Sequence, residues 1–164
     1  MSINLISLFL FYSLVIIIIN QEPESTLLKG KLICSDDNSN LLKYAFDTKF
    51  NTQFYSESES NGWVGMNLLS KYIITRIEWG TNETDKSVYL LGIFEGANEK
   101  NFEDALVLNM IKTEAKINTY NVINIEVKIP FQYIRYIGPS GQHCRINNLR
   151  IYGYSSNFKG QNNN

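Results

Sequence analysis

The sequence is poor in several residue types on which protein chemistry often depends. Its 164 residues include one histidine, two cysteines and three prolines. Because His143 is the only histidine, no His-pair metal motif can form, and the chain also lacks a G-x-S-x-G elbow and a P-loop. The sequence therefore predicts a protein that is not an enzyme.

Positive charge is not in excess either. Lys and Arg number 15 against 16 Asp and Glu, for a net charge of −1. Such a balance supplies no basic face, so we expect no nucleic-acid partner. Aromatic residues, in contrast, are abundant at 13%, with ten Tyr and nine Phe. This content fits all-β packing and equally fits a surface on which a ligand stacks.

The first 20 residues differ from the rest of the chain. Leu5 to Ile19 is an apolar run of about 15 residues, which suits a signal peptide better than a membrane span of about 20. No Lys or Arg precedes the run, so an uncleaved anchor is the alternative. Both interpretations place the remaining chain outside the cell, either secreted or anchored to the outer face of the membrane. We expect membrane contact only if the leader stays uncleaved.

After the leader we expect a linker at 21–28, one domain at 29–155 and a disordered polar tail at 156–164. Ile73, Thr75, Ile77 and Trp79 alternate with polar residues, a two-residue period that indicates a strand. No stretch here carries a long helical stripe. The candidate strands are Lys31–Ser35, Trp63–Leu68, Ile73–Trp79, Val88–Phe94, Ala105–Ile111, Tyr120–Ile129, Tyr133–Ile137 and Leu149–Tyr154. Short strands separated by turn residues predict an all-β sandwich or barrel.

Two further features follow from the expected export. Cys34 and Cys144, near the two ends of the domain, predict one disulfide. Asn82-Glu83-Thr84 is an N-glycosylation sequon, and it lies in a polar, turn-rich segment.

The order of several short blocks resembles one known family. AFDTKFNTQFYS, GWVGMNL, YIITRIEW, GIFEGANEKNF and YIRYIGPSGQHCRINNLRIYG follow one another as in discoidin domains, the coagulation factor 5/8 type C family. The resemblance spans about Lys31 to Tyr154. It implies an all-β, eight-stranded jelly-roll β-sandwich of the galactose-binding-like type with neighbouring termini. It also implies loops gathered at one end, where family members bind glycans, proteins or lipid head groups.

The first of these blocks corresponds to the family's calcium loop. Asp47, Asn51, Thr52 and, near the C-terminus, Asn148 stand where ligands would. Thr48 and Lys49 replace a glycine and an acid of the family pattern, which leaves one carboxylate in the set. Because ligand charge tunes calcium affinity, we expect calcium to be weakly bound or absent and no other cofactor. We also expect Asp47 and Thr52 to hold the loop by hydrogen bonds.

The family's sugar sites draw on three loops, here Phe54 to Asn61, Gly80 to Lys86 and Pro139 to His143. An aromatic face packs on the sugar ring while polar side chains hold its hydroxyls. The candidate ligand-binding residues are Tyr55, Glu57, Asn82 and His143. The family's sugar-binding Arg is missing after the third block, and a glycan on Asn82 would obstruct the same loop. His143 beside Cys144 has the alternative role of supporting the local loop.

The sequence thus predicts a secreted or surface-displayed, non-catalytic binding module. A carbohydrate-binding, lectin-like or cell-adhesion role is the leading interpretation, with a glycan or glycoprotein as the ligand. The alternative is a protein-binding or structural jelly-roll domain whose sugar site has decayed. A lipid-head-group role is disfavoured because Glu57 and Glu59 follow the aromatic pair at Phe54 and Tyr55.

Overall fold

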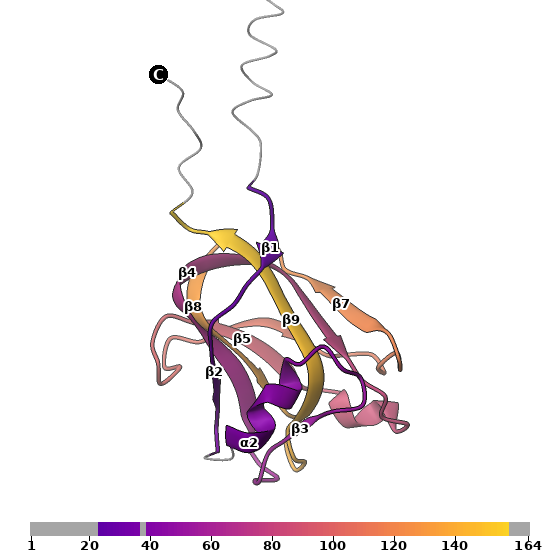
Figure 1. The fold of residues 1–164 in the computed structure, drawn as a ribbon. Helices are drawn as coiled ribbons and strands as arrows, with labels where there is room; N and C mark the ends of the chain where they lie inside the picture. Colours follow the sequence, from indigo (N-terminus) through magenta and orange to yellow (C-terminus); the bar gives the residue numbers. More distant parts are fainter. Residues whose placement is uncertain (1–22, 37–38, 158–164) are drawn as a thin grey trace, which may run out of the picture.

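The computed structural model describes residues 23–36 and 39–157. The predicted leader and the end of the predicted tail, 158–164, lie outside these residues. The elements in chain order are β1 (Thr26–Leu27), β2 (Lys31–Cys34), α2 (Ser39–Leu42), η1 (Lys43–Ala45), β3 (Phe54–Tyr55), β4 (Trp63–Gly80), η2 (Lys86–Tyr89), β5 (Ile93–Ala97), β6 (Leu106–Met110), β7 (Tyr120–Asn124), β8 (Pro130–Ile137) and β9 (Arg145–Ser155). Strands dominate, so the predicted all-β class is confirmed (Figure 1).

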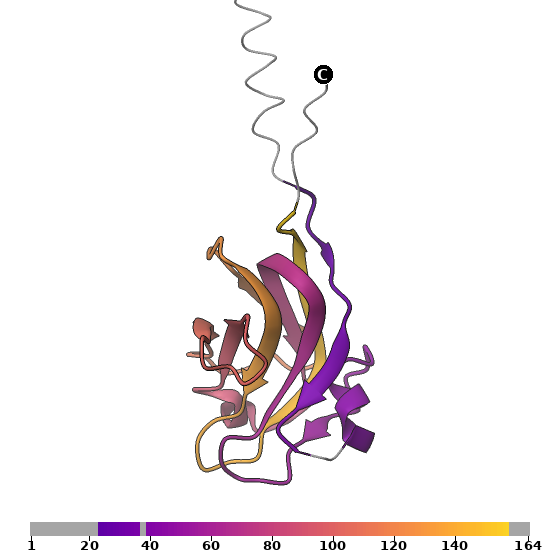
Figure 2. The ribbon, with the colours of Figure 1, turned by 90° about the vertical axis from the view of Figure 1, so that its left-hand side faces the viewer.

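Strand β4 joins two layers of antiparallel strands. Its first part pairs with β2 and β8, and the layer continues through β5 to β6. Its second part pairs with β9 and β7, and β1 and β3 add to β9. The pairing with β8 shifts register between Asn67 and Tyr72, where Leu69 has φ 64°. At this place β4 arches from one layer to the other (Figure 2).

The bend in β4 explains one difference from the sequence-based strands. Trp63–Leu68 and Ile73–Trp79 were expected as two strands, and the structure joins them as one. A second difference lies at Val88–Phe94, where Val88 and Tyr89 end the 3-10 helix η2 and strand β5 begins only at Ile93. Asp85 caps this helix by accepting hydrogen bonds from the backbone N–H and the hydroxyl of Ser87. Local side-chain capping of this kind competes with strand formation.

The core fills the space between the two layers. Trp79, Tyr89, Tyr136, Phe94 and Phe54 are among its fully buried side chains. The edge of the domain lies earlier than expected, because β1 pairs with β9 and the following Leu28 is buried. Residues 26–28, expected as the end of a linker, therefore belong to the sandwich. The first and last strands are neighbours, as the resemblance implied.

The expected disulfide is absent from the structure. The Sγ atom of Cys34 donates to the carbonyl of Asp36 at 2.9 Å, and Sγ of Cys144 lies 3.9 Å from the carbonyl oxygen of Tyr136. Cys144 is fully buried, and burial raises the pKa of its thiol far above the usual range. The prediction of a Cys34–Cys144 bond was wrong because it rested on compartment and position alone, whereas each sulfur has its own backbone acceptor.

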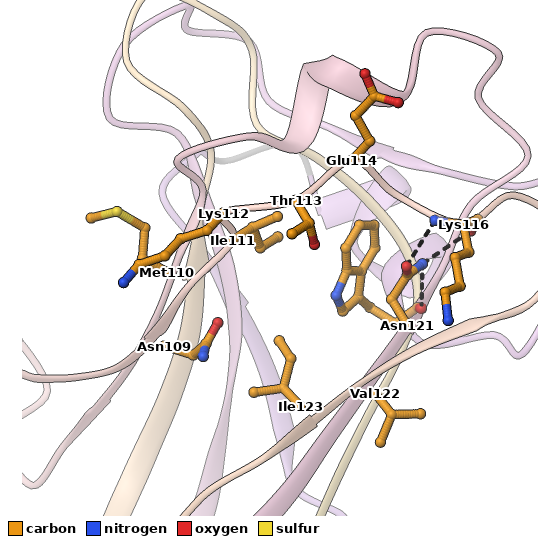
Figure 3. Close-up of a pocket in the computed structure, with 11 residues that line it drawn as sticks. Asn109, Met110, Ile111, Lys112, Thr113, Glu114, Lys116, Asn121, Val122 and Ile123 are labelled. Atoms are coloured by element: carbon orange, nitrogen blue, oxygen red, sulfur yellow. Dashed lines mark hydrogen bonds between the residues drawn. The ribbon is translucent and has the colours of Figure 1, made fainter.

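Two other features of the fold bear on function. Among the described residues, no helix has the length and apolar character needed to cross a membrane. A cavity of about 380 Å³ lies at the open side of the sandwich, where β6 and β7 face it (Figure 3).

Candidate functional site

The candidate site lies where β3 meets the start of β9. In this short antiparallel ladder Phe54 is opposite Ile146, and Tyr55 is opposite Arg145. Because successive side chains of a strand point to opposite faces, Phe54 and Ile146 are buried while Tyr55 faces outward, 38% exposed. Two residues of β3 are thus enough to place an aromatic ring beside a guanidinium group at the surface.

His143 completes this group from the preceding loop. Its imidazole ring stacks on the Tyr55 ring with centroids 4.4 Å apart, and the Arg145 guanidinium lies 5.3 Å from the same ring. Nδ1 of His143 lies 2.8 Å from the backbone carbonyl of Ser56. A carbonyl can only accept, so Nδ1 carries the proton and Nε2 of a neutral ring is an acceptor.

Ser56 fastens the two loops that carry Tyr55 and His143. Its N–H donates to the carbonyl of Cys144 at 2.9 Å, and its hydroxyl accepts from the N–H of Cys144 at 2.7 Å. The same hydroxyl donates to the carbonyl of Ser58. Ser56 is fully buried, so these bonds are shielded from water and hold the loop of His143 against the strand that carries Tyr55.

The third loop reaches the site through Glu83. Its carboxylate Oε2 lies 3.8 Å from Nη1 of Arg145, and its N–H donates to the hydroxyl of buried Thr81 at 2.9 Å. Thr81 is in turn 2.7 Å from the hydroxyl of Tyr89, whose pKa is raised, mainly by burial. In the same loop, two hydrogen bonds from Ser87 lower the pKa of Asp85, and the charge of Arg145 adds to this effect. The three loops predicted to form the site are therefore brought together.

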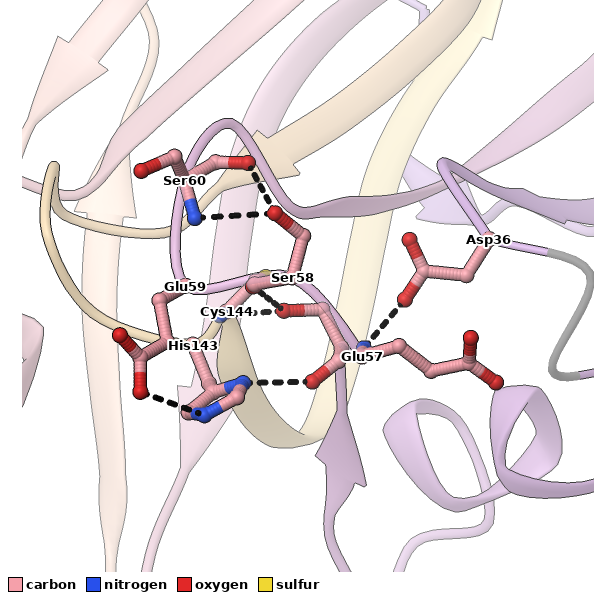
Figure 4. A network of polar contacts seen from close by, with 8 residues as sticks. Asp36, Glu57, Ser58, Glu59, Ser60, His143 and Cys144 are labelled. Atoms are coloured by element: carbon pink, nitrogen blue, oxygen red, sulfur yellow. Dashed lines mark hydrogen bonds and ion pairs between the residues drawn. The ribbon is translucent and has the colours of Figure 1, made fainter.

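The structure brings only two of the four predicted binding residues into contact with each other. Tyr55 and His143 are in direct contact, whereas Asn82 is exposed next to Glu83, and its side chain makes no hydrogen bond to another described residue. The Glu57 side chain points away from His143 (Figure 4), and its backbone N–H is held by Asp36 Oδ2 at 2.5 Å. Glu59, which was not among the candidate binding residues, is the acid beside His143, with Oε1 3.4 Å from Nε2 of the imidazole.

Arg145 was missed by the sequence analysis. After the third block, where the family has its sugar-binding arginine, this chain has Gly80-Thr81-Asn82. The structure supplies a guanidinium from another strand, directly opposite Tyr55. The signal was present in the alternation around it, since Cys144 and Ile146 are buried and the residue between them must face outward.

The calcium loop takes the form of a hydrogen-bonded turn. Both carboxylate oxygens of Asp47 accept from the Thr52 hydroxyl at 2.8 Å, and Oδ1 also accepts from the Lys49 N–H at 3.1 Å. The two residues were expected to hold the loop by hydrogen bonds to backbone N–H groups. Asp47 does so through the Lys49 N–H, whereas Thr52 bonds to the Asp47 carboxylate instead. Thr48, which replaces the family's glycine, has φ 63°, a left-handed conformation that glycine adopts more readily.

The candidate calcium ligands do not fit a calcium site well. Asn148 is buried, and its Oδ1 accepts from the Tyr120 hydroxyl at 2.8 Å, so that oxygen is already engaged. Asn51 is exposed. Asp47 is the only carboxylate of the four, while calcium takes six to eight oxygens. No cluster of three His, Cys, Asp or Glu that could hold a metal occurs within residues 23–36 and 39–157.

Solved structures identify the fold. A CBM62 module from Clostridium thermocellum Xyl5A is 27% identical with a TM-score of 0.74, covering 79% of this chain and 97% of its own. A fucolectin from striped bass (Morone saxatilis) serum is 15% identical with a TM-score of 0.66, covering 77% of this chain and 47% of its own. An F5/8 type C domain from Bacteroides fragilis is 15% identical with a TM-score of 0.61, covering 82% and 99%.

These neighbours are carbohydrate-binding modules, a lectin and an F5/8 type C domain, all with the discoidin-like, galactose-binding fold. The fold predicted from the order of sequence blocks is thereby confirmed. No protein-family profile and no curated protein sequence matches the chain.

Proposed function

We propose that this protein is a non-catalytic carbohydrate-binding module that binds a glycan at the loop end of the sandwich. The observation that carries the proposal is the group formed by Tyr55, His143 and Arg145. It combines an exposed aromatic surface with a charged hydrogen-bond donor, the two components that sugar recognition needs. The likeness to a CBM62 module supports the same function.

The geometry suggests a role for each side chain. The exposed part of the Tyr55 ring offers an apolar surface for the C–H face of a pyranose. The Arg145 guanidinium supplies donors to sugar oxygens, and His143 Nε2 lies 3.4 Å from the Glu59 carboxylate, which can accept from a sugar hydroxyl. Glu59, whose side chain is 73% exposed, and Glu83 add acceptors at the margin.

The surroundings of the site favour sugars without negative charge. Glu57, Glu59, Glu83 and Asp85 all lie in the loops of this end, whereas Arg145 is the cation of the group and already faces Glu83. A uronic acid or another anionic sugar would meet net repulsion here. The same acidity disfavours anionic membranes and nucleic acid.

We further propose that the protein acts outside the cell, secreted or displayed on its surface, where a lectin-like or adhesive role would use this site. Asn82 is exposed, as a glycosylation acceptor must be. A glycan attached there would stand next to Glu83 and would compete with an external ligand for the same space. Glycosylation and glycan binding are therefore alternative uses of this loop.

A glycan array tests the proposed function. The protein, presented as multivalent complexes to compensate for weak single-site affinity, is compared with the variants Tyr55→Ala, His143→Ala and Arg145→Ala. We expect binding to a defined set of neutral glycans and a loss of about tenfold for Tyr55→Ala. An aromatic contact contributes about 0.5–1.5 kcal/mol beyond the buried area, and about 1.4 kcal/mol corresponds to tenfold.

The matched control is Tyr154→Ala. Tyr154 is a partly buried tyrosine at the opposite end of β9, paired with Ile73. This variant should bind the array as the unmodified protein does, and melting temperatures would show that all four variants are folded. An array without any signal under multivalent presentation, or equal signals for Tyr55→Ala and Tyr154→Ala, would reject the proposal and favour a protein-binding or structural domain.

A further inference from the structure

The cavity on the open side of the sandwich lies apart from the Tyr55 group and shares no residue with it. It has a volume of about 380 Å³, within the range of small-ligand sites. Its lining combines residues from β6, β7 and the loop between them with one from β4. These residues are Trp79, Asn109, Met110, Ile111, Lys112, Thr113, Glu114, Lys116, Asn121, Val122 and Ile123.

The strands that flank the cavity each have one unpaired edge in the described part of the chain. β6 pairs with β5 alone, and β7 pairs with β4 alone. The pairing of β6 shifts register at Leu108, which has no partner between Asn109, opposite Phe94, and Val107, opposite Glu95. Such a bulge re-aims the side chains of its strand. Here Asn109 faces the cavity (Figure 3).

The cavity has polar groups that the protein itself leaves unused. Within the described residues, neither the carboxamide of Asn109 nor the hydroxyl of Thr113 makes a hydrogen bond. Asn109 is also the one polar residue of the Leu106–Met110 strand and is only half-exposed. Both groups donate and accept, so together they offer the mixed hydrogen bonding that a sugar hydroxyl pair requires.

The opposite wall is held in place by Asn121. Its Oδ1 accepts from the N–H of Lys116 at 2.8 Å, and its Nδ2 donates to the carbonyl of Lys116 at 3.0 Å. The loop therefore keeps a defined shape over the cavity. Trp79 and Ile111 lie buried beneath the cavity, so the apolar surface open to a ligand comes from Met110, Val122 and Ile123, which are exposed or half-buried.

Two observations decide between classes of ligand. On β6 the bulge at Leu108 interrupts the edge that an added strand would need, and the free edge of β7 extends only over Tyr120–Asn124. The charged lining residues Lys112, Glu114 and Lys116 are exposed, and the Glu114 side chain points away from Asn109 and Thr113 (Figure 3). The cavity thus combines an apolar surface with the uncharged side chains of Asn109 and Thr113, which both donate and accept hydrogen bonds. This combination matches a ligand with an apolar face and hydroxyl groups.

We propose that this cavity is a second carbohydrate-binding site, which holds one uncharged sugar ring between β6 and β7. The ring packs on the apolar surface while Asn109 and Thr113 hydrogen-bond to its hydroxyls. None of its lining residues belongs to the group of Tyr55, His143 and Arg145 at the loop end. Two sites on one small domain would raise the avidity for a long or multivalent glycan without further contacts.

Protein-observed NMR tests the second site. The isotope-labelled protein is titrated with galactose, glucose, mannose, xylose and N-acetylglucosamine up to high millimolar concentration. We expect at least one of these sugars to shift the amide resonances of residues 109–113 and 121–123 together. The double variant Asn109→Ala/Thr113→Ala should weaken this response by about tenfold, since it removes two hydrogen-bonding groups.

Two matched variants separate this site from the first. Asn124→Ala changes an exposed asparagine of β7 that does not line the cavity, and it should leave the response unchanged. Tyr55→Ala should also leave it unchanged. If the sugars shift only resonances around Tyr55 and His143, the second site is wrong and the proposed function stands. If the sugars shift only the cavity resonances, the second site stands and binding at the loop end is rejected. If neither region responds, both binding sites are rejected.

Discussion

At the scale of single residues, the candidate site depends on which side chain each backbone position presents. Tyr55 and Arg145 are 90 positions apart in the chain, yet they are direct partners across the β3–β9 ladder. His143 adds a stacked ring from a loop that Ser56 holds. A small number of buried hydrogen bonds therefore positions the exposed groups on which the proposed binding relies.

The state of Cys144 gives a prediction at this scale. Its thiol is buried and has a strongly raised pKa, so it should be protonated and shielded at neutral and mildly alkaline pH. We expect iodoacetamide at about pH 8 to leave Cys144 unlabelled in the native protein and to label it in guanidinium without any reductant. Peptide mass spectrometry reads out both states. Labelling in guanidinium that requires prior reduction would show that a disulfide exists after all.

The Asp47 turn gives another residue-scale prediction. Thr52→Val keeps the shape of the side chain but removes the hydroxyl that donates to Asp47, so it should cost about 0.5–1.5 kcal/mol of unfolding free energy. Thr52→Ser is the matched control and should stay close to the unmodified protein. Urea unfolding measures both.

The same turn predicts the response to metal. Because Asp47 is the single carboxylate and its oxygens are engaged, we expect EDTA or added calcium to change the melting temperature only slightly in the unmodified protein. A large loss of stability in EDTA would mean that backbone oxygens complete a calcium site in this loop.

At the scale of elements, β4 is the strand on which the sandwich is built, because it contributes to both layers. Its first half runs so close to β8 that a Cβ atom on Gly65 would lie 2.2 Å from the carbonyl oxygen of Ile134 and 2.9 Å from Cα of Arg135. These contacts are with backbone, which cannot rotate away. The glycine at the end of GWVG is therefore required by packing between strands.

Gly65→Ala should destabilise the protein by about 1–3 kcal/mol or more through overpacking between β4 and β8. The control is Gly141→Ala, since Gly141 has open space around its Cα but φ 77°. That variant should cost only about 1–2 kcal/mol, the cost of a left-handed residue with a side chain. Equal stabilities of Gly65→Ala and the unmodified protein in urea would show that the strands can move apart freely.

The turn between β5 and β6 is stabilised by Asp104. Its carboxylate accepts hydrogen bonds from the N–H groups of Asn98 and Glu99, and the one from Glu99 is the main cause of its lowered pKa. A lowered folded-state pKa gives a stabilisation that is present above the unfolded value of about 3.9 and is lost as the pH falls through the folded value.

Asp104→Asn should therefore be less stable than the unmodified protein, with the largest difference in melting temperature above about pH 5 and a narrowing difference towards about pH 3. Thermal unfolding at several pH values measures the difference. The other carboxylates are common to both proteins and cancel in it. A difference that is independent of pH would mean that the charge of Asp104 plays no part.

At the scale of the whole molecule, the two ends of the sandwich differ: one holds the pairing of the first and last strands, and the other holds the candidate site. The first and last strands meet at one end, where β1 pairs with Tyr152 and Gly153 of β9. The loops with Tyr55 and His143 lie at the other end, away from β1 and the end of β9 (Figure 1). The proposed glycan site is therefore kept clear of the end at which the first and last strands pair.

The last prediction concerns the packing of Leu28, which follows β1, into the core of the sandwich. Leu28 is 6% exposed and follows β1 into the core, so Leu28→Ala should lower the unfolding free energy by about 2–4 kcal/mol. Leu27→Ala, one residue earlier, removes a side chain that is 46% exposed and should change it by no more than about 0.5 kcal/mol. Similar urea midpoints for the two variants would mean that residues 26–28 are a linker, as the sequence suggested.

Much of the fold could be predicted from local patterns. Two-residue alternation marked most strands, and the order of short blocks led to the discoidin-like sandwich, because both depend on the local backbone and on burial of one face. Local patterns could not show that Cys34 and Cys144 form no bond with each other, or that the Glu57 side chain points away from His143. Both facts depend on where two loops lie relative to each other, which local alternation does not encode.

By itself, the sequence determined that this chain forms an all-β domain with loops at one end and with few groups for catalysis. Only the tertiary structure decided which side chains meet at that end. Glu59, and not Glu57, lies beside His143. The pairing of β3 with β9 places Arg145 directly opposite Tyr55. The physical reason is that strand pairing joins residues far apart in the chain, so the chemistry of the site arises from register rather than from sequence neighbours.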